Sequence, residues 1–252
     1  MIKEIKNLLA FLTIFPVGMA NDCLVDAANY MYLFPAFGAL IGLIAGLFAL
    51  ALTYFFPNLI VGVAACGFIL LLTGLHHTDG LLDFGDGLMC QGPPEKKIKA
   101  MHDKQTGTGG FMLGLITVLT IAACISQLKQ NVILQSLITS EVSAKLAMVV
   151  LAWCGHSAHE GMNTYFVNAM HGNHRKLRLV ISLAISFGTA FFALKTAGLI
   201  TIVAGLAAAF GTLWVSNRHF NGVTGDVMGA ANELTRMTSL LSIVALTAIG
   251  FI

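Results

Sequence analysis

Seven apolar runs, each long enough to cross a lipid bilayer, constrain the fold of this chain more than any other feature. A transmembrane helix needs about 20 predominantly apolar residues. The chain is 57% hydrophobic and 10% charged, whereas a soluble domain carries about 25% charged residues. We therefore predict an all-α fold, a single polytopic membrane domain over residues 1–252 with about six or seven transmembrane helices and a short N-terminal interfacial or re-entrant helix. The predicted runs are 31–56, 59–76, 110–128, 132–154, 178–195, 197–215 and 237–252.

Three long polar connections, residues 77–109, 155–177 and 216–236, separate these runs and orient the bundle. Eleven of the fourteen Lys and Arg residues lie in these connections or in the N-terminal segment, whereas only Lys129 and Lys195 lie in the short loops of the opposite side. The positive-inside rule then predicts a multi-pass protein of the cell membrane, in contact with lipid, with its functional face in the cytoplasm. The net charge of +2 is too small to indicate a nucleic-acid partner. The cations of the connections are Lys96, Lys97, Lys99, Lys104, Arg175, Lys176, Arg178, Arg218 and Arg236.

Three aspartates stand out in the first polar connection. Asp79, Asp83 and Asp86 are three of only twelve acidic residues in the chain. At 100° per residue their i, i+4, i+7 spacing places them within a 60° arc of one helix face. Like charges repel there unless a cation lies between them, and Mg²⁺ prefers such oxygen ligands. The spacing therefore predicts a magnesium site on a helix.

A second acidic pair, Asp226 and Glu233, lies in the third connection with i, i+7 spacing. Gly229 and Ala230 lie on or near the same helix face and are small enough to let another backbone or a ligand approach. Acids on a helix at a membrane boundary are costly unless they are paired or metal-bound, so this pair also predicts a functional site.

Glycine-rich turns precede two of the predicted helices. Gly107-Thr108-Gly109-Gly110 follows Lys104, and Thr224-Gly225 precedes Asp226. Backbone N–H groups exposed at helix N-termini suit phosphate groups, although glycine is equally common as a cap or loop residue. Together with a carboxylate-held Mg²⁺ and Lys104, the turns indicate phosphoryl-group chemistry.

The histidines do not match a zinc motif. His156-x-x-His159-Glu160 has neither the HExxH nor the HxxEH order. We interpret His156, His159, His174 and Arg175 as lining the mouth of the site, where they contact phosphate or a bulky substrate, or as ordinary interfacial residues. Glu141 and Lys145, deep in one predicted span, either satisfy each other or line the roof of a cavity.

The whole chain resembles the cobalamin synthase family. The resemblance begins at Phe11-Leu12-Thr13-Ile14-Phe15-Pro16-Val17 and continues through Phe34-Pro35 with Gly38 and Gly42. Its specific core comprises three ordered blocks, which are His77-x-Asp79-Gly80-x-x-Asp83-x-x-Asp86-Gly87, Met101-x-Asp103 with Gly107-Thr108-x-Gly110, and Thr224-Gly225-Asp226-x-x-Gly229-Ala230-x-x-Glu233.

The chain departs from the family pattern at three places. These are His102 in place of a cation, Lys104-Gln105 in place of Ser-Arg, and Ser143-Ala144 in place of Ser-Arg.

The resemblance implies a Mg²⁺-dependent membrane transferase that joins α-ribazole, or its 5′-phosphate, to adenosylcobinamide-GDP and releases GMP. It implies that Asp79, Asp83, Asp86 and Asp226 hold Mg²⁺. A carboxylate such as Asp79 or Asp83, or else His77, would take the proton from the attacking hydroxyl; the residues do not decide between them. Nor does the sequence decide the phosphorylation state of the nucleoside, or between a single chain and a homo-oligomer. The residues expected to contact substrate or phosphate are Asp103, Lys104, Gly107, Thr108, Gly110, Thr224, Gly225, Glu233 and Arg175.

Two other functions fit part of the pattern. A CDP-alcohol phosphotransferase has the motif D-x-x-D-G-x-x-A-R, which Asp83-x-x-Asp86-Gly87 begins correctly, but Met89-Cys90 replaces its Ala-Arg pair. An ion or metal transporter would place acids at mid-membrane and polar residues on both sides, whereas here they collect on one side.

Overall fold

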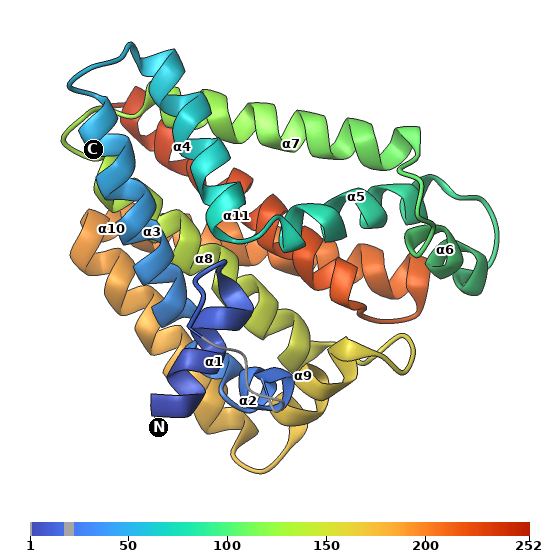
Figure 1. The fold of residues 1–252 in the computed structure, drawn as a ribbon. Helices are drawn as coiled ribbons and strands as arrows, with labels where there is room; N and C mark the ends of the chain where they lie inside the picture. Colours follow the sequence, from blue (N-terminus) through green and yellow to red (C-terminus); the bar gives the residue numbers. More distant parts are fainter. Residues whose placement is uncertain (1, 18–22) are drawn as a thin grey trace.

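The computed structural model describes residues 2–17 and 23–252, and within them it is helical, with a single isolated bridge between Ser157 and Val223 and no strand. The helices form one bundle with the polar helices α5, α6 and α9 toward one end (Figure 1). This confirms the predicted all-α fold. The helices are α1 (Ile2–Leu12), α2 (Cys23–Asn29), the 3-10 helix η1 (Met31–Leu33), α3 (Phe34–Leu52), α4 (Asn58–Leu72), α5 (His76–Met89), α6 (Pro94–Met101), α7 (Thr108–Gln127), α8 (Ile133–Cys154), α9 (Met162–His171), α10 (Arg175–Phe220) and α11 (Gly225–Ala248).

Helix α8 is the central element of the bundle and packs against α3, α10 and α11. The contact with α3 is close because glycines face the backbone of α8. A Cβ atom at Gly42 would lie 2.5 Å from the carbonyl oxygen of Leu137, and one at Gly38 equally close to that of Glu141. Such small-residue faces let membrane helices approach each other at backbone distance.

The structure does not confirm the predicted count of about six or seven membrane spans. By length and composition, four helical segments in the described part of the chain could cross a membrane: 31–52, α7, α8 and α10. A fifth is added if α4 and α5, bent by 94° relative to each other, are counted as one broken span. The predicted run 237–252 is only the second half of α11, which begins at Gly225. The exact span count is therefore not confirmed.

Helix α10 contains both predicted runs 178–195 and 197–215. Its 46 residues would extend about 69 Å if straight, more than twice the roughly 30 Å hydrocarbon core of a bilayer. However, Leu194 and Lys195 are non-helical, with Lys195 at φ 53°. The backbones of Ala190 and Gly198 are in direct contact, so the chain turns sharply there and α10 consists of two halves.

The polar connections are not loops but contain short helices. The first holds α5 and α6, the second holds α9, and the third ends in the first turns of α11. Helix α5 starts after a turn at Gly74 and Leu75, both with positive φ, and this turn redirects the chain away from α4. The predicted N-terminal helix is present as α1, which is too short to span a bilayer.

A closed set of buried polar side chains joins α8 to α11, and we call it the buried ionic ring: Glu141, Lys145, Asn232, Glu233 and Arg236. The Arg236 guanidinium donates hydrogen bonds to both Glu141 and Glu233. Lys145 Nζ donates to Asn232 Oδ1 (2.6 Å), and Asn232 Nδ2 donates to Glu233 Oε1 (3.1 Å). Lys145 Nζ also lies 3.9 Å from Glu141 Oε2. Two cations and two anions are thus balanced inside the bundle.

The assignment of Arg236 to a polar connection is wrong, because its side chain is fully buried.

Candidate active site

The site is built where α5 crosses the first turns of α11 at backbone distance. A Cβ atom at Gly80 would lie 2.9 Å from Asp226 Cα, and one at Gly229 would lie 3.0 Å from the carbonyl oxygen of His77. Glycine at both positions therefore lets the two backbones meet and brings Asp226 beside the aspartates of α5. The prediction that the triad and Asp226 are carried on helices is confirmed.

The charge of Asp83 shows how crowded these carboxylates are. Burial, followed by the negative charges of Asp226, Asp79 and Asp86, raises the pKa of Asp83 to about 7. Burial also raises the pKa of Asp226, against the attraction of His102. Burial and the neighbouring carboxylates thus disfavour the charged form of Asp83, and a cation bound among these acids would relieve their repulsion.

Asp86 differs from the other two aspartates because its carboxylate is already held by the backbone. It accepts hydrogen bonds from the N–H groups of Gly107 and Gly110, each at 2.7 Å, at the N-terminus of α7. These are two of the N–H groups expected to bind phosphate. In the structure they bind Asp86 instead, so this turn fastens α7 to α5.

We expect Asp86→Ala to lower the free energy of unfolding by about 1–3 kcal/mol, because two charge-assisted hydrogen bonds at a helix N-terminus are lost. Asp103→Ala is the matched control, since the exposed Asp103 accepts one bond, from the Gln105 N–H at 3.2 Å. Thermal unfolding in detergent compares the two. Equal loss of stability in both variants would contradict the proposed fastening role.

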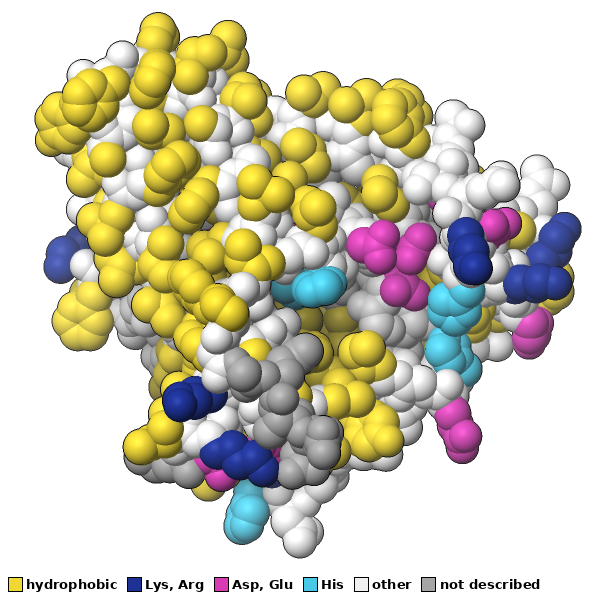
Figure 2. Space-filling view, in the orientation of Figure 1, with side chains coloured by type: hydrophobic (Ala, Val, Ile, Leu, Met, Phe, Trp, Pro, Cys, Tyr) yellow, Lys and Arg dark blue, Asp and Glu magenta, His cyan; other side chains and the backbone are white. Residues whose placement is uncertain are grey.

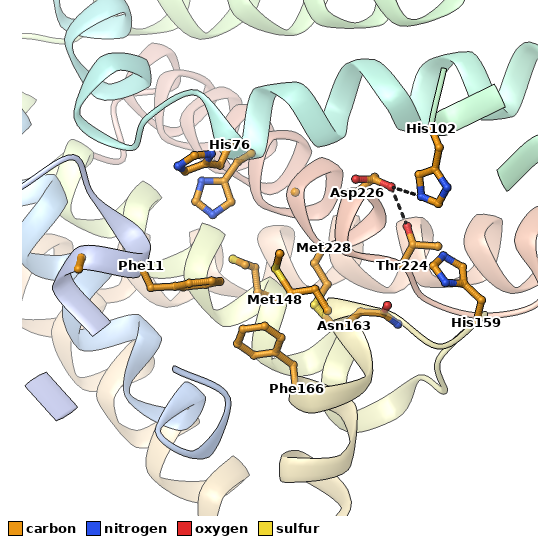
Figure 3. A pocket seen from close by; sticks show the side chains of 15 residues that line it. Phe11, His76, His102, Met148, His159, Asn163, Phe166, Thr224, Asp226 and Met228 are labelled. Carbon is orange, nitrogen blue, oxygen red and sulfur yellow. Dashed lines mark hydrogen bonds and ion pairs between the residues drawn. The ribbon is translucent and has the colours of Figure 1, made fainter. Parts of the chain in front are cut away.

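A cavity of about 450 Å³ opens beside this cluster. Its titratable lining residues are Asp226 and the histidines His76, His77, His102 and His159. Figure 2 shows acidic and histidine side chains around a hollow with hydrophobic side chains inside it. In Figure 3, His102 and His159 lie beside Asp226 on one side of the cavity, with His76 on the other.

Contacts within the cavity rim fix the position of Asp226. His102 Nε2 lies 3.8 Å from Asp226 Oδ2, and the rings of His102 and His159 meet edge to face at 5.5 Å. Thr224 Oγ1 accepts a hydrogen bond from the Val227 N–H (3.2 Å) and so caps α11. Thr224 and Gly225 also line the cavity.

The structure does not bring all of the expected site residues together. Asp103, Lys104 and Thr108 are exposed near the start of α7 and do not line the cavity. Arg175 packs over the Trp153 ring at 4.8 Å, at the start of α10. Glu233 is buried in the buried ionic ring.

Several lining residues were not predicted from the sequence. His102 was noted only as a departure from a family pattern, and His76 was not assigned to the site. The apolar lining residues Phe11, Met148 and Phe166 carry no local signal of a site, because each belongs to an ordinary apolar run.

Comparisons with known proteins agree over the full length of the chain. The family model described as cobalamin-5-phosphate synthase matches residues 4–244. The chain belongs to the cobalamin-5-phosphate synthase family. It is similar to adenosylcobinamide-GDP ribazoletransferases of Methanococcoides burtonii (34% identity, 98% of this chain, 93% of the relative) and Thermoanaerobacter sp. (30%, 97% and 99%). Members of this family are transferases of cobalamin synthesis, so the chain is an enzyme. No solved structure matches it.

The carboxylates suit Mg²⁺ chemically but do not form a closed metal cage. Within residues 2–17 and 23–252, no three His, Cys, Asp or Glu side chains converge closely enough to hold an ion by themselves. Mg²⁺ usually keeps several waters and is held by one or two carboxylates together with substrate phosphates. An open, crowded set of acids such as Asp79, Asp83 and Asp226 therefore fits a metal that arrives with a pyrophosphate.

The raised pKa of Asp83 makes stability depend on pH when no divalent cation is present. A carboxyl whose pKa is higher in the folded state than its ordinary value of 3.8 stabilises the fold at low pH, and this contribution is lost as pH rises through about 7. We expect stability to fall by about 1–2 kcal/mol between pH about 5 and about 8, after allowing for the partial exposure of Asp83. Thermal unfolding measured across this range in a chelator provides the check.

Asp83→Asn should flatten that pH profile, whereas Glu95→Gln, on the exposed face of α6, should leave it unchanged. Added Mg²⁺ should raise the unfolding temperature of the unmodified protein most at high pH. A profile that is the same in Asp83→Asn and the unmodified protein would contradict the assignment of the titration to Asp83.

Proposed function

We propose that this protein is the adenosylcobinamide-GDP ribazoletransferase of cobalamin biosynthesis, joining α-ribazole or its 5′-phosphate to adenosylcobinamide-GDP. The single observation that carries the proposal is the position of Asp226, which both lines the cavity and belongs to the acidic cluster around Asp83. A nucleoside in the cavity and a pyrophosphate at the cluster can therefore meet. The names of the full-length relatives support this choice.

The reaction is a displacement at phosphorus. A hydroxyl oxygen of the nucleoside bonds to the phosphorus atom that carries the corrinoid. The bond from that phosphorus to the bridging oxygen breaks, and GMP leaves with that oxygen. The hydroxyl proton passes to a base, for which Asp79, Asp83 and His77 are the candidates.

His77 has the protonation state that a proton acceptor needs. Burial, followed by the positive charges of Lys145 and Arg236, lowers its pKa well below the ordinary value. Its imidazole is therefore neutral at physiological pH. Asp83, with its raised pKa, is the alternative, and the choice between them stays open.

Asp79, Asp83 and Asp226 are the residues that would hold Mg²⁺, and Asp86 would support them from the α7 turn. The ion would neutralise the charge that develops on the pyrophosphate and on the leaving GMP. We place this site on the cytoplasmic face of the cell membrane, because α6, which follows α5 directly in the chain, carries Lys96, Lys97 and Lys99, and the positive-inside rule assigns such cations to the cytoplasm.

The test is release of GMP by the purified protein in nanodiscs, supplied with adenosylcobinamide-GDP and α-ribazole, with and without Mg²⁺. We expect release that requires both substrates and Mg²⁺. Release without Mg²⁺ would overturn the metal role alone. No release from folded protein, with turnover of CDP-diacylglycerol and an alcohol instead, would overturn the proposed reaction in favour of a phospholipid synthase.

A further inference from the structure

The cavity beside Asp226 has an apolar floor with a definite composition. Phe11 of α1 and Phe166 of α9 lie with ring centroids 5.4 Å apart. Met148 of α8 and Met228 of α11 lie next to them (Figure 3). Four helices thus contribute aromatic rings and thioethers to one surface, which is the lining that flat aromatic ligands prefer.

Most of the polar groups of the cavity are exposed or half-buried, whereas Met148, Phe166 and Met228 of its floor are buried. His76 and His102 are exposed and His159 and Asp226 are half-buried, whereas His77 is buried. Among the deeper residues, Asn163 has already committed its amide N–H groups to Ser157 Oγ (2.6 Å) and the Val223 carbonyl oxygen (2.7 Å). A ligand with an apolar body and one polar end therefore fits with the body on the floor and the polar end at Asp226.

The volume of the cavity decides which substrate it can take. About 450 Å³ accommodates a nucleoside of about 20 non-hydrogen atoms, whereas a corrinoid with its nucleotide is several times larger. The guanine ring of the leaving nucleotide is the remaining candidate. Its several polar edge atoms would be left without partners against Phe166, Met148 and Met228, which is costly.

We propose that this cavity is the nucleoside subsite, with the dimethylbenzimidazole ring of α-ribazole on the Phe11, Phe166, Met148 and Met228 floor and the ribose hydroxyls at Asp226. The inference rests on the proposed function and deepens it, because it assigns one of the two substrates to named residues. The corrinoid pyrophosphate then occupies the acidic cluster outside the cavity. The floor residues determine which lower-ligand base is accepted.

Binding of α-ribazole alone tests the subsite without requiring turnover. Ala10, on α1, lines the cavity, and Ala10→Trp should fill it. We expect at least about tenfold weaker binding of α-ribazole to Ala10→Trp by calorimetry in nanodiscs. Ile5→Trp introduces the same side chain on the same helix at a half-exposed position outside the cavity, and this variant should bind α-ribazole as the unmodified protein does.

A kinetic comparison separates this role from a general effect on the fold. In Phe11→Leu we expect the KM for α-ribazole to rise several-fold, with the KM for adenosylcobinamide-GDP unchanged. Two results would overturn the subsite: unaltered α-ribazole binding by a folded Ala10→Trp protein, and displacement of α-ribazole from the unmodified protein by GMP. In either case, GMP release by the unmodified protein would still support the proposed function. Absence of both binding and turnover in the unmodified protein would instead overturn the proposed function.

Discussion

Asp83→Asn is expected to reduce Mg²⁺-dependent GMP release by about 100- to 1,000-fold. The substitution keeps the shape of the side chain and removes only its charge, at the position where the negative charges of Asp226, Asp79 and Asp86 converge. The charge that develops on the pyrophosphate in the transition state would then not be neutralised by a correctly positioned cation. Single-turnover GMP release with saturating substrates gives the measurement.

The stability of the variant distinguishes loss of chemistry from loss of fold. Because Asp83→Asn relieves repulsion, it should unfold at the same or a higher temperature than the unmodified protein when no metal is present. Glu95→Gln, an exposed acid on α6, is the control and should retain full activity. An Asp83→Asn protein that is folded and fully active would show that the acidic cluster does not bind the metal of the reaction.

Removing one charge from the buried ionic ring is expected to have the largest effect on stability. Glu141→Leu leaves Lys145 and Arg236 facing only Glu233, so one positive charge remains unbalanced inside the bundle. Breaking a buried ion pair in this way costs about 3–5 kcal/mol. The fraction of folded protein after detergent extraction and the unfolding temperature should both fall strongly.

The paired substitution separates charge balance from packing. Glu141→Leu with Lys145→Leu leaves the ring neutral, with Arg236 still bound to Glu233. We expect the double variant to be more stable than Glu141→Leu alone, a non-additivity that a double-mutant cycle measures. If the two substitutions add, the ring contributes packing but no electrostatic coupling.

The elements that local spacing specifies were predictable from the sequence. The i, i+4, i+7 aspartates of α5 and the acids of α11 lie on helices as expected, because helix periodicity is a property of neighbouring residues. Gly229 was expected to allow the approach of a backbone or a ligand, and the structure shows that it is a backbone, that of α5.

The features that depend on tertiary contacts could not be predicted in the same way. Arg236 looks like a loop cation in sequence, because its partner Glu141 lies 95 positions earlier in the chain. The GTGG turn resembles an anion site, and only the fold shows that Asp86 is the anion it binds. Likewise, Phe11 and Phe166 form one surface only because α1 and α9 meet.

The buried ionic ring also bears on how the chain enters a membrane during synthesis. Helix α8 carries Glu141 and Lys145 four positions apart, and α11 carries Glu233 and Arg236 three positions apart. A charge at the centre of an inserting helix costs about 2.5–3.5 kcal/mol, but within each of these two pairs the acid and the base can neutralise each other from the outset. Helix α8, whose only charged residues are this pair, can therefore leave the translocon as an electrically neutral segment. When α11 packs against α8, Arg236 gains Glu141 as a second partner beside Glu233, and this contact fastens α11 to the bundle.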